Sequence, residues 1–148
     1  MPDQAPEHAK IVVALDFGLK RIGIASGNTL TRSAHPRTTI ANGDWQALER
    51  VLTDSQPARI AVGEPYNADG SASPLTEAAR RFAAELVQRY RVPVDLVDER
   101  WSSQDAEERL RGMRSSGERK RRVTRADVDA AAAAVILERW FETQLTKT

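Results

Sequence analysis

The 148-residue chain contains no cysteine and only two histidines. The absence of cysteine excludes a disulfide framework and any cysteine-ligated zinc site. The histidines, His8 and His35, are far apart, and His35 directly precedes Pro36. We therefore expect neither a histidine-based metal site nor a Ser-His-Asp triad, and interpret the two histidines as a tail residue and a strand-edge residue.

Long hydrophobic runs are also missing. No stretch approaches the roughly 20 apolar residues of a membrane span, and residues 1–9 lack the basic and apolar regions of a signal peptide. We therefore expect a cytoplasmic protein without a membrane partner. The chain length indicates one domain that buries its own core. We place that domain at residues 10–143, with a flexible tail at 1–9 and a second tail at 144–148.

Charge is unevenly distributed, although the net charge is only +1. The segment from residue 109 to 125 has one acid, Glu118, and many basic residues: Arg109, Arg111, Arg114, Arg119, Lys120, Arg121, Arg122 and Arg125. Such a segment is either a solvated loop or a contact for a polyanion. The candidate contacts to a nucleic-acid backbone are Arg119, Lys120, Arg121 and Arg122.

Short apolar runs alternate with helical repeats along the chain. The runs predict a three-stranded meander followed by two further strands, at residues 10–17, 21–25, 38–40, 59–62 and 92–97. Helical spacing of apolar residues predicts helices that begin near residues 45, 74, 102 and 125, the last ending near residue 142. Strands alternating with helices imply parallel crossovers. We therefore expect an α/β fold, a ribonuclease H-like mixed five-stranded sheet with helices on both faces.

Three acidic residues stand at the ends of these elements. Asp16 closes the first strand, Glu99 follows the strand at 92–97, and Asp129 lies near the start of the last helix. Carboxylates are preferred ligands of hard divalent cations, and two cations about 4 Å apart stabilise both the attacking and the leaving oxygen of a phosphodiester. The acids therefore predict a nuclease that uses two Mg²⁺ or Mn²⁺ ions, and leave open whether Asp98 shares the ligand role with Glu99.

The last helix separates two aspartates by role. Thr124 and Asp127 have the spacing of an N-cap and its partner, so Asp127 is interpreted as a capping residue. Asp129 instead shares a face with the apolar residues Ala133, Ile136 and Trp140, which should pack on the sheet. A carboxylate there costs several kcal/mol unless it is compensated. A metal ion would compensate it, and a salt bridge to an arginine or a partly exposed first turn is the alternative.

Basic and polar residues near these acids are candidate phosphate contacts. Lys20 and Arg21 follow Asp16, Arg100 follows Glu99, and Asn67 lies in a polar loop at 64–73. For the two arginines, the alternative is a surface salt bridge. For Asn67, the alternative is an ordinary turn residue.

Four segments occur in an order that is specific to one family. The chain resembles the YqgF/RuvX family of ribonuclease H-like nucleases, related in fold to Holliday-junction resolvases, from about residue 11 to 141. The matching segments are 14–23 (ALDFGLKRIG), 62–70 (VGEPYNADG), 97–103 (VDERWSS) and 128–130 (VDA). Three positions depart from the family pattern: Glu64 and Trp101 replace leucine, and Ser103 replaces threonine.

The resemblance implies a nuclease for structured RNA or branched DNA, with a role in maturing the 5′ end of precursor 16S rRNA during ribosome biogenesis. It implies that Asp16 bridges two metal ions, that Glu99 ligates one, and that Asp129 completes the site. A Holliday-junction resolvase-like DNA nuclease and a non-catalytic nucleic-acid-binding module remain alternatives. An actin-like ATPase lobe also begins with Asp-x-Gly on a strand, but the chain has length for only one of its two lobes. The expected state is a monomer or a homodimer.

The basic segment generates a test. Replacing Arg119, Lys120, Arg121 and Arg122 by alanine should weaken the binding of structured RNA broadly across sequences. Removal of each phosphate-binding side chain should reduce the slope of log affinity against log salt by about one unit. Fluorescence anisotropy over a salt series measures both quantities. An unchanged affinity and slope would identify the segment as a solvated loop.

Overall fold

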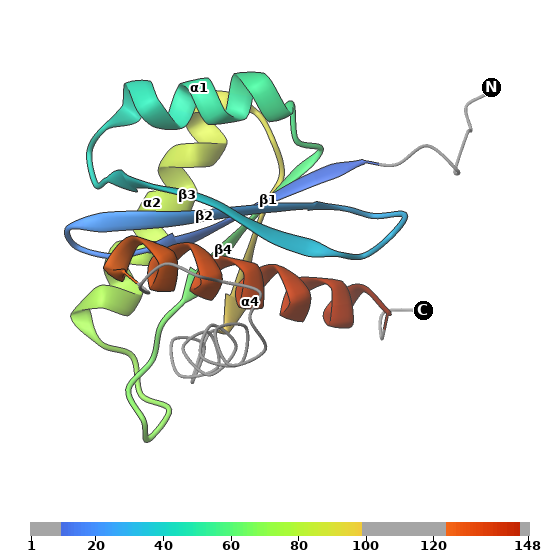
Figure 1. Ribbon diagram of the computed structural model, residues 1–148. Coiled ribbons are helices and arrows are strands. Elements are labelled where there is room, and N and C mark those ends of the chain that lie inside the picture. The colour runs from blue at the N-terminus through green and yellow to red at the C-terminus, as the bar shows by residue number, and fades with distance from the viewer. Residues whose placement is uncertain (1–9, 99–123, 146–148) are drawn as a thin grey trace.

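A computed structural model describes residues 10–98 and 124–145 (Figure 1). The strands are β1 (Ile11–Phe17), β2 (Arg21–Asn28), β3 (Ala34–Ala41), β4 (Arg59–Glu64) and β5 (Val94–Asp98). The helices are α1 (Trp45–Ser55), α2 (Pro74–Tyr90) and α4 (Arg125–Leu145). The helix expected to begin near residue 102 lies outside the described residues. None of the described helices is both long and apolar enough to cross a membrane.

The strands form one mixed sheet in the order β3-β2-β1-β4-β5. β1 pairs with β2, and β2 with β3, in antiparallel fashion, whereas β1–β4 and β4–β5 are parallel. Helices α1 and α2 cover one face and α4 crosses the other (Figure 1). The predicted five-stranded α/β architecture with helices on both faces is therefore confirmed.

β1 lies at the centre of the sheet and is buried on both faces, as its continuous apolar run predicts. Val13, Leu15 and Phe17 pack in the core beneath α1 and α2, which includes Phe82. Val12 and Ala14 point the other way, into the core shared with α4. Successive side chains alternate between faces, so each position of β1 can be assigned to one helix layer or the other.

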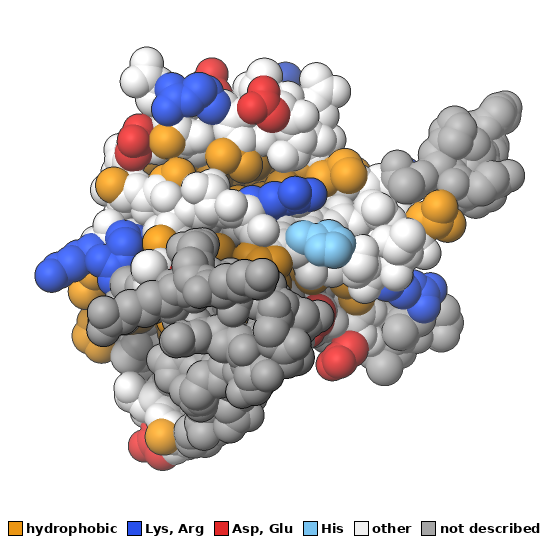
Figure 2. Space-filling model, in the orientation of Figure 1, with side chains coloured by type: hydrophobic (Ala, Val, Ile, Leu, Met, Phe, Trp, Pro, Cys, Tyr) orange, Lys and Arg blue, Asp and Glu red, His pale blue; other side chains and the backbone are white. Residues whose placement is uncertain are grey.

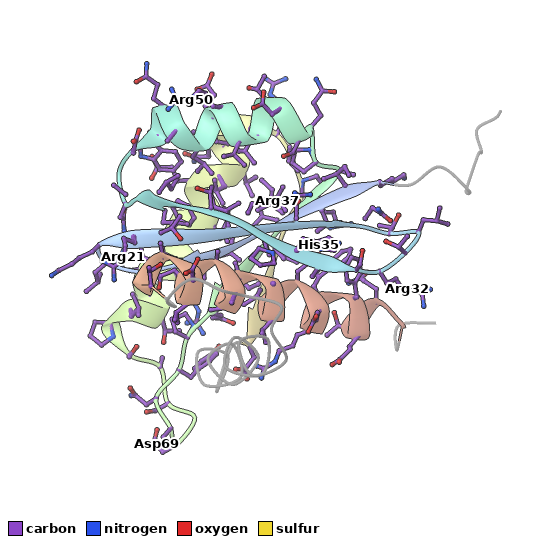
Figure 3. The ribbon with its side chains drawn as sticks, in the orientation of Figure 1. Arg21, Arg32, His35, Arg37, Arg50 and Asp69 are labelled. Atoms are coloured by element: carbon purple, nitrogen blue, oxygen red, sulfur yellow. The ribbon has the colours of Figure 1, made fainter. Side chains whose placement is uncertain are left out.

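β3 is longer than the sequence indicated, since it begins at Ala34 and includes Pro36. Proline lacks an N–H donor, and an edge strand tolerates it because one side of the strand needs no partner. The β2–β3 register shifts between Ile24 and Ala25, where Ala25 pairs with Pro36. His35 is exposed on this edge strand (Figures 2 and 3), in agreement with its interpretation as a strand-edge residue.

The helix starts are set by local hydrogen bonds. Asp44 caps α1 by accepting from the Ala47 amide, and a Ser73–Thr76 capping box with a proline at the first turn opens α2. At α4, the amide of Thr124 donates to Asp127 Oδ2 at 3.0 Å, and the Asp127 amide donates back to Thr124 Oγ1 at 3.2 Å. The predicted capping role of Asp127 is thus confirmed.

Small residues let α4 lie close to the sheet. The helix buries a run of alanines from Ala130 to Ala134, and it meets Ala14, Ala25 and Ala61 of the sheet. Gly23 is the tightest point, since a Cβ there would lie 2.0 Å from the backbone oxygen of Asp129. Only glycine permits this approach.

The far end of α4 is held by polar contacts to β5. Trp140 is 4% exposed, as its predicted core position requires, and its indole Nε1 donates to Asp95 Oδ2 at 2.7 Å. Arg59 Nη1 donates to the same carboxylate at 3.2 Å. α4 continues to Leu145, beyond the helix end expected near Glu142.

We predict that Gly23→Ala destabilises the fold by about 1–3 kcal/mol or more, because the new methyl group would meet the backbone of α4 rather than a movable side chain. Chemical denaturation monitored by circular dichroism measures the change. An unfolding free energy within about 0.5 kcal/mol of wild type would show that the helix does not lie this close to β2.

Candidate functional site

The candidate site lies at the carboxyl ends of the parallel strands. β1, β4 and β5 run in the same direction, so their last residues meet at one edge of the sheet, where open α/β sheets place their sites. Asp16, Glu64 and Asp98 each stand at or next to one of these strand ends. Acids whose side chains face the same side of the sheet can act together, so the face of each acid has to be established.

Asp16 belongs to the α4 side of the sheet. It follows Val12 and Ala14 at two-residue intervals, and both of those residues pack in the core shared with α4. Its cross-strand partner on β2 is Gly23, and the Cα atoms of such opposed residues are about 4.5–5.5 Å apart. Asp16 is half-buried.

Asp129 reaches the same place from α4. Its backbone oxygen lies against Gly23, the partner of Asp16, and Thr39 of β3 helps to hold this end of the helix by donating to the Ala126 carbonyl at 2.9 Å. The face predicted for Asp129 is confirmed, since Ala133 and Ile136 are fully buried on the sheet. Two of the three acids chosen from the sequence are therefore brought together around one glycine.

Asp129 is paired with Arg21. Arg21 Nε donates to Asp129 Oδ2 at 2.8 Å, and the two side chains are 39% and 19% exposed. Figure 3 shows Arg21 beside the N-terminal end of α4. The salt bridge that the sequence left open as an alternative for both residues is the contact that the structure contains. A guanidinium thus compensates the inner-face carboxylate.

The turn between β1 and β2 presents basic side chains next to this pair. Lys20 is exposed, and Figure 2 shows Lys and Arg side chains gathered at this end of the molecule. The turn is held by Asn42, whose Nδ2 donates to the Gly18 carbonyl at 2.6 Å and whose backbone amide donates to the Lys20 carbonyl at 2.9 Å. The backbone that carries Lys20 and Arg21 is therefore fixed.

The third acid, Glu99, lies outside the described residues, as do Arg100 and the candidates Arg119, Lys120, Arg121 and Arg122. Within residues 10–98 and 124–145, no group of three His, Asp or Glu side chains forms a metal-holding cluster. Asp98 is exposed, and strand alternation directs it away from Val97, which faces α4. Asp98 therefore does not share the face of Asp16, whereas Glu99 follows Val97 by two positions in the sequence.

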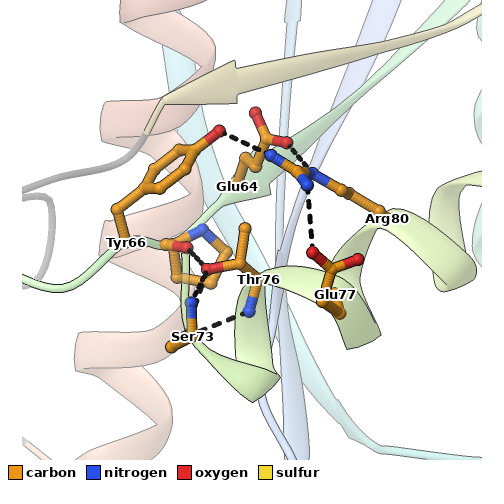
Figure 4. Close-up of polar contacts among 7 residues, drawn as sticks. Glu64, Tyr66, Ser73, Thr76, Glu77 and Arg80 are labelled. Atoms are coloured by element: carbon orange, nitrogen blue, oxygen red, sulfur yellow. Dashed lines mark hydrogen bonds and ion pairs between the residues drawn. The ribbon is translucent and has the colours of Figure 1, made fainter. Parts of the chain in front are cut away.

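Glu64 belongs to the opposite face and has a structural partner (Figure 4). Arg80 Nε donates to Glu64 Oε2, while its other nitrogens donate to the Tyr66 hydroxyl at 3.0 Å and to Glu77 Oε2 at 3.1 Å. The hydrogen bond to Glu64, followed by that to Tyr66, raises the pKa of Arg80 above its ordinary value. The departure of Glu64 from the family pattern is explained by this pairing across β4 and α2.

Asn67 lies in a turn that its own side chain helps to form. Asn67 Nδ2 donates to Ser71 Oγ at 2.9 Å, and Gly70 completes the turn with a φ of +90°. The hydroxyl and amide of Ser71 donate to Asp69, which lowers the pKa of that exposed carboxyl. The turn expected for this loop is present. The phosphate contact of Asn67 stays a prediction.

A separate pocket of about 630 Å³ lies between β5 and the C-terminal half of α4. Its described lining includes Asp95, Asp98, Arg139 and Trp140, but neither Asp16 nor Asp129. Arg139 donates to the Asp98 carbonyl at 3.2 Å, and Asp95 is held by Trp140 and Arg59. The two acids beside Gly23, Asp16 and Asp129, therefore lie outside the described lining of this pocket.

Two residues important for the site were not selected from the sequence. Gly23 sets the distance between β2 and α4. Besides its place in the family segment 14–23, its signal was a glycine inside a predicted strand, which can mark a close backbone approach. Asp95 fixes the other end of α4 through Trp140. Nothing in its local sequence distinguished it from an exposed strand residue.

Curated proteins match this chain over most or all of its length. A protein of Edwardsiella ictaluri is 45% identical over 139 residues, which cover 91% of this chain and 96% of the relative. A protein of Xylella fastidiosa is 41% identical over 153 residues, covering 100% of this chain and 98% of the relative. Both carry the name of a candidate pre-16S rRNA nuclease.

Solved structures share the fold at low sequence identity. Thermus thermophilus RuvC in complex with a Holliday junction substrate has a TM-score of 0.59 and 16% identity, and the match covers 94% of this chain and 98% of RuvC. The yeast mitochondrial Holliday junction resolvase has a TM-score of 0.53 and 11% identity, with coverage of 90% and 78%. A family profile described as RuvX, Holliday junction resolvase, matches residues 10–143. With this profile match and relatives above 40% identity over at least 91% of its length, the chain belongs to the RuvX family.

Proposed function

We propose that this protein is a divalent-metal-dependent endonuclease that hydrolyses phosphodiester bonds in structured RNA. Its proposed substrate is the 5′ end of precursor 16S rRNA, in the cytoplasm, during ribosome biogenesis. The names of the relatives support the RNA substrate, and the family supports a nuclease. The observation that carries the proposal is the meeting of Asp16 and Asp129 around Gly23.

The residues at this point fit a divalent metal ion. The donors are carboxylate oxygens, the ligands that Mg²⁺ and Mn²⁺ prefer. A cationic guanidinium already binds one of them at 2.8 Å, so the position favours positive charge. Asp16 and Asp129 would hold the metal, together with Glu99. The chemistry supplied by two bound ions is charge stabilisation at the attacking and leaving oxygens of the phosphodiester.

The contribution of the chain itself is to place these carboxylates before substrate arrives. Asp16 is fixed because the central strand β1 pairs with β2 along its whole length and with β4 as far as Leu15. Asp129 is fixed because α4 is held against Gly23 at one end and through Trp140 and Asp95 at the other. Ligands on such rigid elements lose little freedom on binding. Lys20, Arg21 and Asn67 are the proposed phosphate contacts among the described residues, joined by Arg100 and the basic segment.

A Holliday-junction-cleaving DNA nuclease is the second candidate. The fold shared with RuvC, solved with a junction substrate, favours it. A cleavage screen distinguishes the two functions: precursor 16S rRNA fragments and four-way DNA junctions are each incubated with Mn²⁺ and wild-type protein or Asp16→Asn. We expect the wild-type protein to cleave the RNA fragments, and Asp16→Asn not to cleave them. Cleavage of junctions only would select the second candidate, and cleavage of neither would indicate a non-catalytic binding module.

Each of the three proposed ligands should be indispensable. Asp16→Asn, Glu99→Gln and Asp129→Asn should each abolish Mn²⁺-dependent cleavage while the fold is retained, because a carboxamide keeps the shape but not the charge of the ligand. Removing one of several neighbouring carboxylates also relieves repulsion in the metal-free protein. Activity assays and thermal melts with and without Mn²⁺ provide the test. Full activity in any variant would remove that residue from the site.

Asp127 and Asp129 lie two residues apart on α4, so their alanine variants can be compared directly. Asp127→Ala should lower the unfolding free energy by about 1 kcal/mol and keep Mn²⁺ binding, because its carboxylate serves the Thr124 cap. Asp129→Ala should eliminate Mn²⁺ binding with a smaller loss of stability, because its partly exposed ion pair with Arg21 contributes about 0–1 kcal/mol. Calorimetric titration and denaturant unfolding measure both. The reverse pattern would move the metal site to the other face of α4.

A further inference from the structure

The contact between Arg21 and Asp129 has features that the metal proposal alone does not explain. Arg21 is the first residue of β2, and it reaches α4 through its Nε atom. Among the described residues, Arg21 is the one side chain that donates to the Asp129 carboxylate. By contrast, the carboxylate of Asp95 accepts from both Arg59 and Trp140. Within the described part of the chain, the Asp129 carboxylate is therefore held by one side-chain contact.

We propose that Arg21 holds Asp129 in the metal-free protein and transfers to a nucleic-acid phosphate when a metal ion binds that carboxylate. The inference rests on the proposed metal site. The Arg21 guanidinium neutralises a carboxylate that is only 19% exposed, on a residue whose backbone oxygen lies against Gly23, the cross-strand partner of Asp16. It thereby keeps the ligands assembled without a metal ion.

The exchange follows from charge. A divalent cation bound to the Asp129 carboxylate would neutralise the charge that the Arg21 guanidinium otherwise neutralises. The metal ion and the guanidinium would then repel each other at contact distance. Arg21 can leave without a change in the fold, because its side chain is 39% exposed and its turn is fixed by Asn42. A guanidinium released next to the proposed metal site has the planar fork of donors that fits a phosphate.

The exchange makes metal binding and phosphate binding cooperative. A metal ion releases Arg21 for the phosphate, and a phosphate that holds Arg21 removes the competitor of the metal ion. By linkage, each ligand must strengthen the binding of the other by the same factor. The bare protein then binds metal weakly, and the complete site forms on the substrate.

Calorimetric titration with Mn²⁺ alone tests the competition. Arg21→Ala should bind Mn²⁺ about 3- to 5-fold more tightly than wild type, the factor that corresponds to a partly exposed ion pair. Lys20→Ala is the matched control, since it removes one positive charge from the same turn without removing the ion pair to Asp129. Equal affinities for Arg21→Ala and wild type, or the same gain in both variants, would overturn the exchange.

A second measurement follows the wild-type protein directly. In the arginine Nε–H region of a ¹H–¹⁵N spectrum, Mg²⁺ should move the Arg21 signal from its ion-paired position and leave the Arg89 signal unchanged. Arg89 pairs with Glu85 on α2 at 2.9 Å. The Arg21 and Arg89 signals are assigned by their loss in the variants Arg21→Lys and Arg89→Lys. An Arg21 signal that keeps its position at saturating Mg²⁺ would overturn the exchange.

Asp129→Asn separates this inference from the proposed function. If wild type does not bind Mn²⁺, or if Asp129→Asn binds it as well as wild type, the metal site itself is wrong and the exchange falls with it. If Mn²⁺ binding requires Asp129 but is indifferent to Arg21, the metal site stands and only the role of Arg21 is refuted.

Discussion

The close approach of α4 to the sheet is the constraint on which the candidate site depends. Alanines on the helix meet alanines and a glycine on the sheet, so the backbone of Asp129 touches Gly23 directly. Gly23 in turn pairs with Asp16. A larger residue at position 23 would separate the two acids. Packing of apolar small residues thus sets the geometry of a charged site, and the helix cannot shift locally because Trp140 and Asp95 hold its other end.

Charge compensation explains why the Asp129 carboxylate is tolerated at this packed junction. Asp129 is largely buried but is paired with a guanidinium, which offsets the desolvation of the ionised group. The other acids near the strand ends are directed elsewhere: Glu64 pairs with Arg80 on the opposite face, and Asp98 is exposed at the edge strand. Of these acids, Asp16 and Asp129 are the two that adjoin Gly23. Glu99 remains a ligand proposed from the sequence.

Local periodicity was sufficient to predict much of this arrangement. The apolar run of β1 indicated a central strand, and helical phase separated the capping Asp127 from the inward-facing Asp129. Contacts between distant segments were not predictable, because they depend on register and on packing distance. The partner of Asp129 could be named as an arginine but not as Arg21. The pairing of Glu64 with Arg80 and the anchoring of Trp140 by Asp95 became visible only once β4, β5 and the helices were in place.

The proposed metal site is tested most directly by anomalous diffraction from crystals soaked in Mn²⁺. The account predicts an anomalous difference peak within ligand distance, about 2.0–2.5 Å, of carboxylate oxygens of both Asp16 and Asp129, beside Gly23. The Arg21 guanidinium should then be displaced from Asp129. A peak bound elsewhere, such as at Asp95 or Asp69, with Arg21 still paired to Asp129, would contradict it.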